Sequence, residues 1–381
     1  MKRIFSILTL LLLLFSLPLP TVATEESTAK YEFLPTKVGT NIVSNTEESP
    51  LWQKSALFLG DSICYNKAEQ LVDPSTAGWA GRIGTDYDME WQNLGFSGAT
   101  VSMVKENCTP NQLLSVVNSA KPDIILLQGG INDAYSGVKL GTVEEGFSLN
   151  SFDTTSYAGS MQQLFAICRR YFPDAQVFYL IHHTTPNSLS SSDLSKKNPP
   201  KADPANYVTM TKTLCEKWEI PYLNLYEDVR FNTEIFDTAN NTTGCMWPDL
   251  LHMSTRGYEV LTPYLIAWME EYLLAKEAEE FLSAVSAAEE AFAAETAPTP
   301  EERFALLHEA LSAYQKLGSA ARHEYRQRMF DLLCLVDEYN EIADAINQEA
   351  AGAYALTDAP QTAAADLLLG LWFGLKETTT L

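Results

Sequence analysis

Between residues 54 and 275, short apolar runs alternate with longer amphipathic segments, and this alternation limits the folds open to the chain. The runs contain four to eight residues and are bounded by Gly, Pro, Asp or Asn; we interpret them as strands at 56–59, 89–94, 123–128, 176–181 and 220–225. The segments 111–120, 157–172 and 206–218 have helical spacing. Strand and helix in alternation predict a parallel sheet with helices on both faces. Five strands fit a flavodoxin-like three-layer α/β sandwich.

The composition changes after the last predicted strand, and we expect a separate α-helical bundle over residues 276–381. The stretch from Trp268 to Ala294 is rich in Ala, Glu and Leu and is interpreted as helical. A further helix is predicted from Thr299 to Leu317, because Thr299 suits an N-cap and Pro300 suits the first helical position.

A third helix of the bundle is expected from Ala320 to about Asn347, with apolar residues at three- and four-residue steps. The apolar tail at 364–375 is too short to span a bilayer. We expect it to pack on the bundle, and binding to a surface is the alternative. No chemical motif occurs in residues 276–381, so we interpret the region as a spacer, a stabilising bundle or a module that docks a partner.

The first 24 residues have the layout of a signal peptide. A basic start, Met1-Lys2-Arg3, precedes an apolar stretch from Ile4 to Leu19 and small residues at 22–24. An uncleaved membrane anchor is the alternative. We expect residues 25–53 to form an arm or linker, the protein to be secreted or displayed at the cell surface, and no membrane span to follow signal cleavage.

The net charge of −23 argues against nucleic acid and anionic membranes as partners, because no basic patch is available to neutralise phosphates. The six cysteines include no Cys-x-x-Cys pair, which argues against a zinc site of that type. Cys168, Cys215 and Cys334 lie in helical apolar patterns and are expected to be buried thiols. One disulfide bond among the remaining three, Cys64, Cys108 and Cys245, stays open.

Gly60-Asp61-Ser62-Ile63 closes the first predicted strand and leads toward a helix. A serine at this point stands at the carboxyl edge of the sheet, where helix N–H groups would face a developing anion. Gly-Asp-Ser is also ordinary turn chemistry, so the alternative is that Ser62 caps the helix. The chain has no Gly-x-Ser-x-Gly elbow of the α/β-hydrolase type.

Polar loops also follow the second and third predicted strands. The first contains Gly95 and Gly98, and the glycines around its serine allow a tight turn with an outward N–H. The second contains Asn132 within Gly-Ile-Asn-Asp. Because an Asn side chain offers two donors and does not titrate, it suits an oxyanion hole.

Asp249 and His252 lie three residues apart, just before a helix predicted to begin near Thr255. At this spacing the carboxylate can accept a hydrogen bond from the ring Nδ1–H, which orients the imidazole and stabilises its cation. Ser, Gly, Asn, and then Asp with His thus occur in four loops at one edge of the predicted sheet.

This ordered set resembles the SGNH hydrolases, also called the GDSL family of esterases and lipases, over residues 55–265. The resemblance implies Ser62 as nucleophile, His252 as base and Asp249 as its orienter. It also implies an oxyanion hole made by the N–H of Ser62, the N–H of Gly98 (with Gly95 as the alternative) and the side chain of Asn132. No metal or organic cofactor is needed. Met253 departs from the family, in which a proline frequently follows the histidine.

Other polar and aromatic residues near these loops are candidates for a role in substrate binding. His182 and His183 follow the fourth predicted strand and are interpreted as loop residues or substrate contacts without catalytic duty. Trp79, Trp247 and Tyr135 are candidates for an aromatic sugar platform, and packing in the core or rim is the alternative for each. The segments 133–153 and 184–205 are polar insertions, and the second is long enough for a lid or binding loop.

A secreted, acidic serine esterase with a polar loop suits a hydrophilic extracellular ester. We therefore expect hydrolysis of O-acyl groups, acetyl above all, on a carbohydrate. The alternatives are a lipase or lysophospholipase, acyl transfer to a glycan, and a non-catalytic surface-binding protein that uses the helical region.

Overall fold

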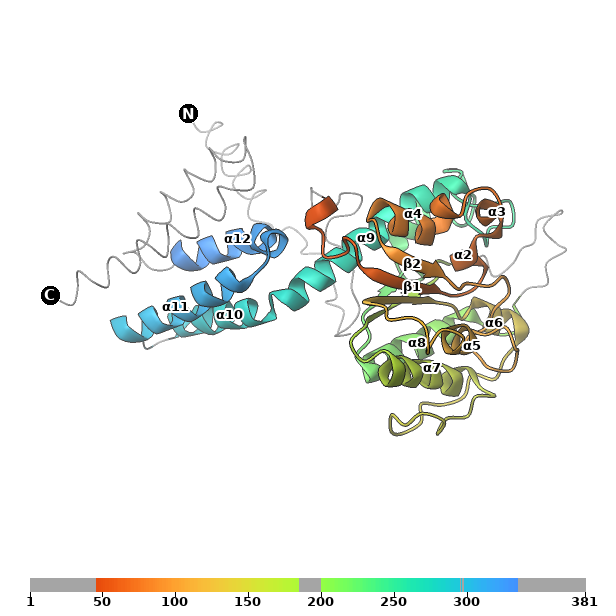
Figure 1. The fold of residues 1–381 in the computed structure, drawn as a ribbon, viewed down its shortest axis with the longest axis horizontal. Coiled ribbons are helices and arrows are strands. Elements are labelled where there is room, and N and C mark those ends of the chain that lie inside the picture. The colour runs from red at the N-terminus through yellow and green to blue at the C-terminus, as the bar shows by residue number, and fades with distance from the viewer. Residues whose placement is uncertain (1–45, 185–199, 295, 297, 335–381) are drawn as a thin grey trace, which may run out of the picture.

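The computed structural model describes residues 46–184, 200–294, 296 and 298–334. In these residues a five-stranded parallel sheet of order β2-β1-β3-β4-β5 lies between two layers of helices (Figure 1). The strands are β1 (Ser55–Leu59), β2 (Glu90–Asn93), β3 (Ile124–Gln128), β4 (Gln176–Ile181) and β5 (Tyr222–Asn224). This strand order confirms the predicted flavodoxin-like three-layer sandwich.

Helices cover both faces of the sheet and continue into a C-terminal bundle. In the α/β part they are α2 (Ser62–Tyr65), α3 (Lys67–Gln70), α4 (Gly78–Asp86), α5 (Thr109–Leu114), α6 (Ile131–Ser136), α7 (Tyr157–Tyr171), α8 (Pro204–Trp218) and α9 (Thr255–Glu277). The bundle adds α10 (Glu279–Ala293), α11 (Pro300–Lys316) and α12 (Ser319–Cys334). Short 3₁₀ turns lie at Thr46–Glu48 and Pro74–Thr76, and a π-helical turn lies at Phe231–Ile235.

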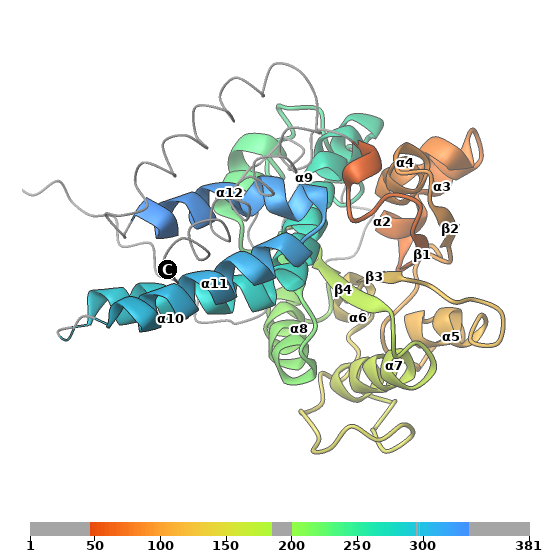
Figure 2. The same ribbon diagram turned by 60° about the vertical axis from the view of Figure 1, so that its left-hand side comes forward.

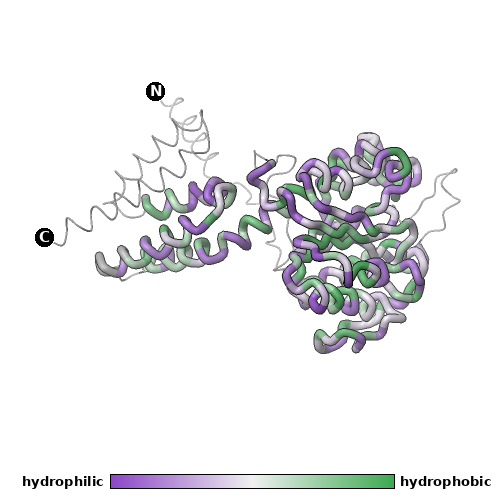
Figure 3. Tube along the Cα trace, viewed as in Figure 1, coloured by the Kyte–Doolittle hydropathy of each residue, from purple (hydrophilic) through white to green (hydrophobic). Residues whose placement is uncertain are grey.

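The side chains of β1 show why this sheet is buried on both faces. Ala56 and Phe58 belong to the core shared with α4 and α9, whereas Leu57 and Leu59 belong to the core shared with α5, α7 and α8. Successive strand residues point to opposite faces, so an unbroken apolar run requires cover on both sides. Figure 3 shows the hydrophobic strands at the centre of the sandwich.

Helix α9 contributes to two hydrophobic cores. One is the core that it shares with α4 on one face of the sheet, called here the sheet-side core, and the other is the core of the bundle. Leu261 and Leu265 pack in the sheet-side core, and Leu274 packs with the side chains of α10 and α11. The bundle helices α10 and α11 lie side by side beyond it (Figure 2). The predicted domain limit at 275/276 falls inside α9, so one continuous helix carries the chain from the sandwich into the bundle.

Two predicted helices differ from the observed ones. The helix predicted at 111–120 is α5 and ends at Leu114; Ser115 and Ser119 then bond backbone carbonyls, an alternative that competes with helix continuation. The helical stretch predicted from Trp268 to Ala294 is divided between α9 and α10 at Ala278. No Gly or Pro marks that break, which is why the sequence pattern did not reveal it.

The start of α11 is as predicted. Thr299 accepts a hydrogen bond from the Glu302 N–H, and the Glu302 side chain accepts one from the Thr299 N–H, which completes a capping box. Most of α12 falls within the third predicted bundle helix. The proposed signal peptide, most of the N-terminal arm, most of the loop at 184–205 and the apolar tail lie outside the described residues.

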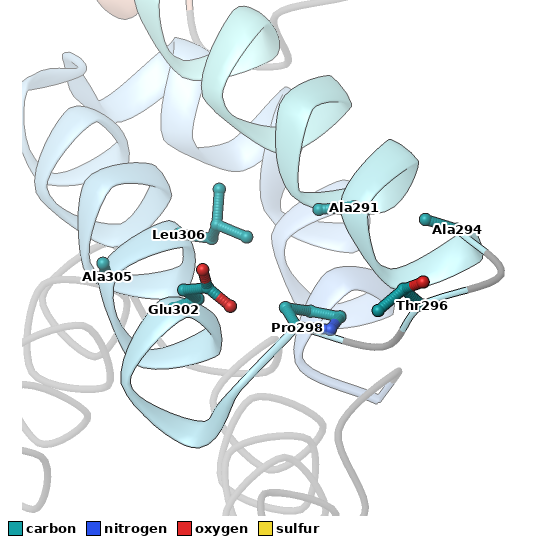
Figure 4. A pocket seen from close by; sticks show the side chains of 7 residues that line it. All are labelled: Ala291, Ala294, Thr296, Pro298, Glu302, Ala305 and Leu306. Atoms are coloured by element: carbon teal, nitrogen blue, oxygen red, sulfur yellow. The ribbon is translucent and has the colours of Figure 1, made fainter.

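Two observations concern the surface of the described part. None of its helices combines the length and the hydrophobicity that crossing a bilayer requires. A shallow groove lies between the C-terminal end of α10 and the start of α11, lined mainly by Ala291, Ala305 and Leu306 (Figure 4). Glu302, which also lines the groove, accepts the Thr299 N–H of the capping box through Oε2.

Candidate active site

Ser62 lies directly after β1, as the first residue of α2. Asp61 is the N-cap of that helix, and its side chain accepts a hydrogen bond from the Ile63 N–H at 2.9 Å. The alternative that Ser62 caps the helix is therefore wrong. Because Asp61 satisfies the helix terminus, the Ser62 hydroxyl is available for another partner.

A buried polar cluster holds the chain rigid immediately before Ser62. Gln128, at the end of β3, donates to the Asp61 carboxylate at 3.3 Å and accepts from the Asp61 N–H at 3.3 Å. A Cβ on Gly60 would lie 2.7 Å from the Gln128 carbonyl oxygen, so only glycine fits there. Burial raises the pKa of the Asp61 carboxyl, although its hydrogen bonds with Ile63 and Gln128 oppose the shift.

Asp249 and His252 lie on a tight turn between Trp247 and the start of α9. The Trp247 N–H donates to the His252 carbonyl at 2.8 Å, and the backbones of Met246 and Met253 form a bridge that closes the turn. Met253, where the family frequently has proline, is buried in the sheet-side core. Leu250 has φ of +53°, an uncommon conformation for a residue with a branched side chain.

The fold brings Ser62, His252 and Asp249 into one hydrogen-bonded chain. Ser62 Oγ lies 2.8 Å from His252 Nε2, and His252 Nδ1 lies 2.7 Å from Asp249 Oδ2. The ring therefore carries its proton on Nδ1, toward the carboxylate, and presents Nε2 to the hydroxyl as an acceptor. This arrangement allows His252 to remove the Ser62 proton and Asp249 to stabilise the resulting cation.

The loop after β2 distinguishes the two candidate glycines. The Gly95 N–H donates to the Asn93 side chain at 3.0 Å, so it is already engaged. Gly98 has φ of +80° within a turn closed from Ala99 N–H to the Phe96 carbonyl, and a Cβ there would meet no atom within 4 Å. The Gly98 N–H has no hydrogen-bond partner among the described residues. The geometry thus favours Gly98 over Gly95 as an oxyanion donor.

Asn132 lies in the first turn of α6 and is linked to the same loop. Its side-chain Nδ2 donates one hydrogen bond to the Ala99 carbonyl at 3.0 Å. An amide nitrogen carries two hydrogens, so a second remains available. The contact places Asn132 next to Gly98 in space, as an oxyanion hole shared by these residues requires.

Asp133, to which no role was predicted from the sequence, fastens the Gly98 loop to α6. Its carboxylate accepts hydrogen bonds from the Val101 N–H at 2.8 Å and the Ser102 N–H at 2.9 Å. Burial raises its pKa to about 7, against the opposing effect of these two bonds. The only sequence signal was its position beside Asn132, because its partners lie about thirty residues earlier in the chain.

The two histidines after β4 are buried beneath the site. His182 Nδ1 donates to the His183 carbonyl at 2.7 Å, and His183 Nε2 donates to the Leu251 carbonyl at 3.1 Å. Burial lowers the pKa to about 4 for His182 and about 3 for His183. Both are therefore neutral near pH 7, and His183 contacts the turn of Asp249 and His252.

The three aromatic candidates have different environments. Trp79 is fully buried against Phe58, with ring centroids 5.5 Å apart, so it is a core residue and no sugar platform. Tyr135 is half-buried and packs against the same core. Trp247 has 45 % of its surface exposed and lies on the turn that carries Asp249 and His252.

The cysteines that the structure describes near the site form no disulfide bond. Cys64, Cys108 and Cys245 are free, so the disulfide bond left open among them does not form; Cys168 and Cys215 are free and buried, as predicted. Over the described residues, no cluster of His, Cys, Asp and Glu side chains is arranged to hold a metal ion.

Solved structures with a similar arrangement have low sequence identity. A protein from Lactobacillus plantarum is 20 % identical with a TM-score of 0.44, and covers 58 % of this chain and 98 % of its own. A possible lipase from Chitinophaga pinensis is 16 % identical with a TM-score of 0.42, over 56 % of this chain and 96 % of its own. A family two carbohydrate esterase from Clostridium thermocellum, solved with cellohexaose, is 15 % identical with a TM-score of 0.37, over 58 % and 65 %.

No relative was found among curated proteins. The model of the GDSL-like Lipase/Acylhydrolase family matches residues 58–260, which is more than half of the chain and contains every candidate site residue. The chain therefore belongs to the GDSL-like lipase/acylhydrolase family, the SGNH hydrolases, and is a carboxylic ester hydrolase.

Proposed function

We propose that this protein hydrolyses O-acyl esters, acetyl esters above all, of extracellular carbohydrate through a Ser62-His252-Asp249 triad. The observation that carries the catalytic part is the continuous hydrogen-bonded chain from Ser62 Oγ to Asp249 Oδ2, with links of 2.8 and 2.7 Å. Nucleophile, base and orienter within hydrogen-bond reach of one another are the recognised signature of nucleophilic ester hydrolysis.

In the proposed mechanism, Ser62 Oγ attacks the ester carbonyl while His252 Nε2 takes the hydroxyl proton. The Ser62 N–H, the Gly98 N–H and the second Asn132 Nδ2 hydrogen stabilise the oxyanion. His252 returns the proton to the leaving alcohol, and an acyl-enzyme remains on Ser62. A water molecule, deprotonated by His252, then attacks the acyl carbonyl; the bond to Ser62 Oγ breaks, His252 returns the proton to Oγ, and the carboxylic acid leaves.

The carbohydrate part of the proposal is supported by the sequence and by one exposed side chain. The apolar stretch at the N-terminus suits secretion, and the net charge of −23 suits a protein that acts away from anionic lipid. Trp247 is 45 % exposed and lies on the turn that carries Asp249 and His252, so it offers an aromatic side chain to solvent on that turn. An aromatic face suits a sugar ring, whose C–H groups are apolar.

A lipase or lysophospholipase activity is the second candidate, and exposed apolar residues favour it. Leu71 and Val72 follow the helices after β1, Phe96 and Val104 follow β2, and Val229 follows β5. All five are exposed on segments that leave the carboxyl edge of the sheet, where Ser62 lies. Exposed apolar groups around a site favour contact with an acyl chain or lipid.

One pair of experiments separates these possibilities. Purified protein is labelled with a fluorophosphonate and assayed on acetylated glycans and on p-nitrophenyl esters of increasing chain length, with Ser62→Ala as the control. We expect Ser62 to be labelled, acetate to be released, and short esters to be preferred. Normal turnover by a folded Ser62→Ala protein contradicts the triad, whereas a preference for long esters supports the lipase.

A further inference from the structure

The turn that carries Asp249 and His252 has a hydrogen bond from the sheet beneath it. His183 Nε2 lies 3.1 Å from the carbonyl oxygen of Leu251, one of the two residues between Asp249 and His252 on the turn. The two residues are 68 positions apart in the chain. We propose that His183 is a positioning residue, which holds this turn against the end of β4 so that His252 reaches Ser62.

The direction of this hydrogen bond follows from the chemistry of its two partners. The Leu251 carbonyl can only accept, so His183 Nε2 carries the hydrogen. Because burial lowers the pKa of His183 to about 3, the ring stays neutral and holds one hydrogen. Nδ1 is then an acceptor, and it is buried with no partner among the described residues. An unpaired buried acceptor is unfavourable, so the neutral ring occupies this position at a cost in free energy.

The turn is closed by the Met246–Met253 bridge and its leucines pack on the core, and the bond from His183 adds a directional contact to its backbone. Among the described residues, the other backbone hydrogen bonds of residues 247–252 stay within the turn, such as Leu250 N–H to the Trp247 carbonyl at 2.9 Å. Leu250, with φ of +53°, is in a conformation that its side chain disfavours. The bond from His183 therefore ties a strained turn to the rigid sheet.

His183 is itself well anchored. Its carbonyl accepts the His182 Nδ1 hydrogen at 2.7 Å, and its ring packs edge-on against Phe236 with centroids 5.9 Å apart. The next residue, Thr184, bonds the Asn232 side chain through both its N–H and its hydroxyl. Because these contacts hold its backbone and its ring, His183 can define the position of the carbonyl to which it donates.

The inference rests on the proposed triad, and a matched pair of variants tests it. His183→Gln keeps a nitrogen donor at the distance of Nε2, whereas His183→Met has the same length without a donor. We expect His183→Met to lower kcat on p-nitrophenyl acetate by about ten- to hundredfold with KM little changed, because displacing a reacting group by about 1 Å has effects of that size. We expect His183→Gln to stay within about threefold of the original kcat.

Ser49→Ala controls for loss of stability. It removes a buried hydrogen bond of 2.7 Å to Glu270 and contacts no residue of the site. Thermal unfolding of each variant shows how much of it is native at the assay temperature, and kcat values are compared per native protein. Equal kcat for the Gln and Met variants, or a loss in His183→Met no larger than that in Ser49→Ala, overturns the inference. Failure of the His183→Gln protein to fold also overturns the inference, because Gln can keep the hydrogen bond to the Leu251 carbonyl.

The outcome for the triad is read separately. If Ser62→Ala retains activity, the proposed function fails. If Ser62→Ala is inactive and His183→Met is fully active, the triad stands and only the role of His183 is wrong.

Discussion

Asp249 holds His252 at two points. Its Oδ2 accepts from the ring Nδ1 at 2.7 Å, and its Oδ1 accepts from the His252 backbone N–H at 2.9 Å. Oδ1 also accepts from the Leu251 N–H at 3.0 Å. One carboxylate therefore shapes the turn and orients the ring, so its two functions can be separated by substitution.

Asp249→Asn is expected to lower kcat by about 10³–10⁴ while the protein keeps its fold. The remaining carbonyl oxygen can still accept the two backbone hydrogens, but an NH₂ group facing Nδ1 favours the wrong ring tautomer. Steady-state kinetics and circular dichroism measure the two effects. Comparable losses of activity and structure would indicate that Asp249 acts mainly on the turn.

Asn132→Ala is expected to lower kcat by about 10²–10³, because it removes a donor that acts on charge formed in the transition state. KM for a small ester should change little. The same substitution also removes the contact with the Ala99 carbonyl, so the unfolding free energy of the variant is measured beside its kinetics. A change confined to KM would show that Asn132 binds the substrate in its ground state only.

Gly60→Ala and Gly98→Ala are expected to differ sharply in stability. At Gly60 the new methyl group would lie 2.7 Å from the Gln128 backbone oxygen and 2.9 Å from Cys64 Cβ, so the buried core must shift. At Gly98 it meets open space, and the φ of +80° imposes a strain of about 1–2 kcal/mol. Denaturant unfolding of both variants measures the difference, and equal losses would contradict the packing described at Gly60.

Asp133 is expected to make stability fall as pH rises from about 4 to 7. Its pKa in the folded protein is about 7, against 3.8 in the unfolded chain, so the folded state retains a proton that the unfolded state has lost. The contribution of Asp133 to the free energy of unfolding is most favourable below the unfolded pKa and is lost as pH rises through the folded pKa. Between these two pKa values it declines by roughly 1.4 kcal/mol per pH unit.

Asp133→Asn tests this pH dependence, because the amide does not titrate. Unfolding free energies of both proteins are measured between pH 4 and 8. The free energy of unfolding of the original protein minus that of the variant should decline with rising pH until about pH 7 and then level off. A difference that does not vary with pH would show that Asp133 ionises normally despite its burial.

Much of the fold was predictable because it depends on patterns within short stretches of sequence. All five strands were placed to within two residues at either end, since a run such as 124–127 is apolar throughout and lies between Asp123 and the Gly129-Gly130 pair. The start of α11 followed from Thr299 and Pro300 for the same local reason. The end of α5 and the break at Ala278 were missed because neither is marked by Gly or Pro.

The candidate site divides in the same way. The sequence by itself determined the residues of the proposed chemistry, because Ser62 and Asn132 follow strand ends and Asp249 and His252 precede a helix, each in a recognisable motif. The choice of Gly98 over Gly95, the role of Asp133 in fastening the Gly98 loop and the contact of His183 with Leu251 were decided only by the tertiary structure. These depend on hydrogen bonds between residues far apart in the chain or on the direction of single N–H groups, and neither is encoded in the spacing of residue types.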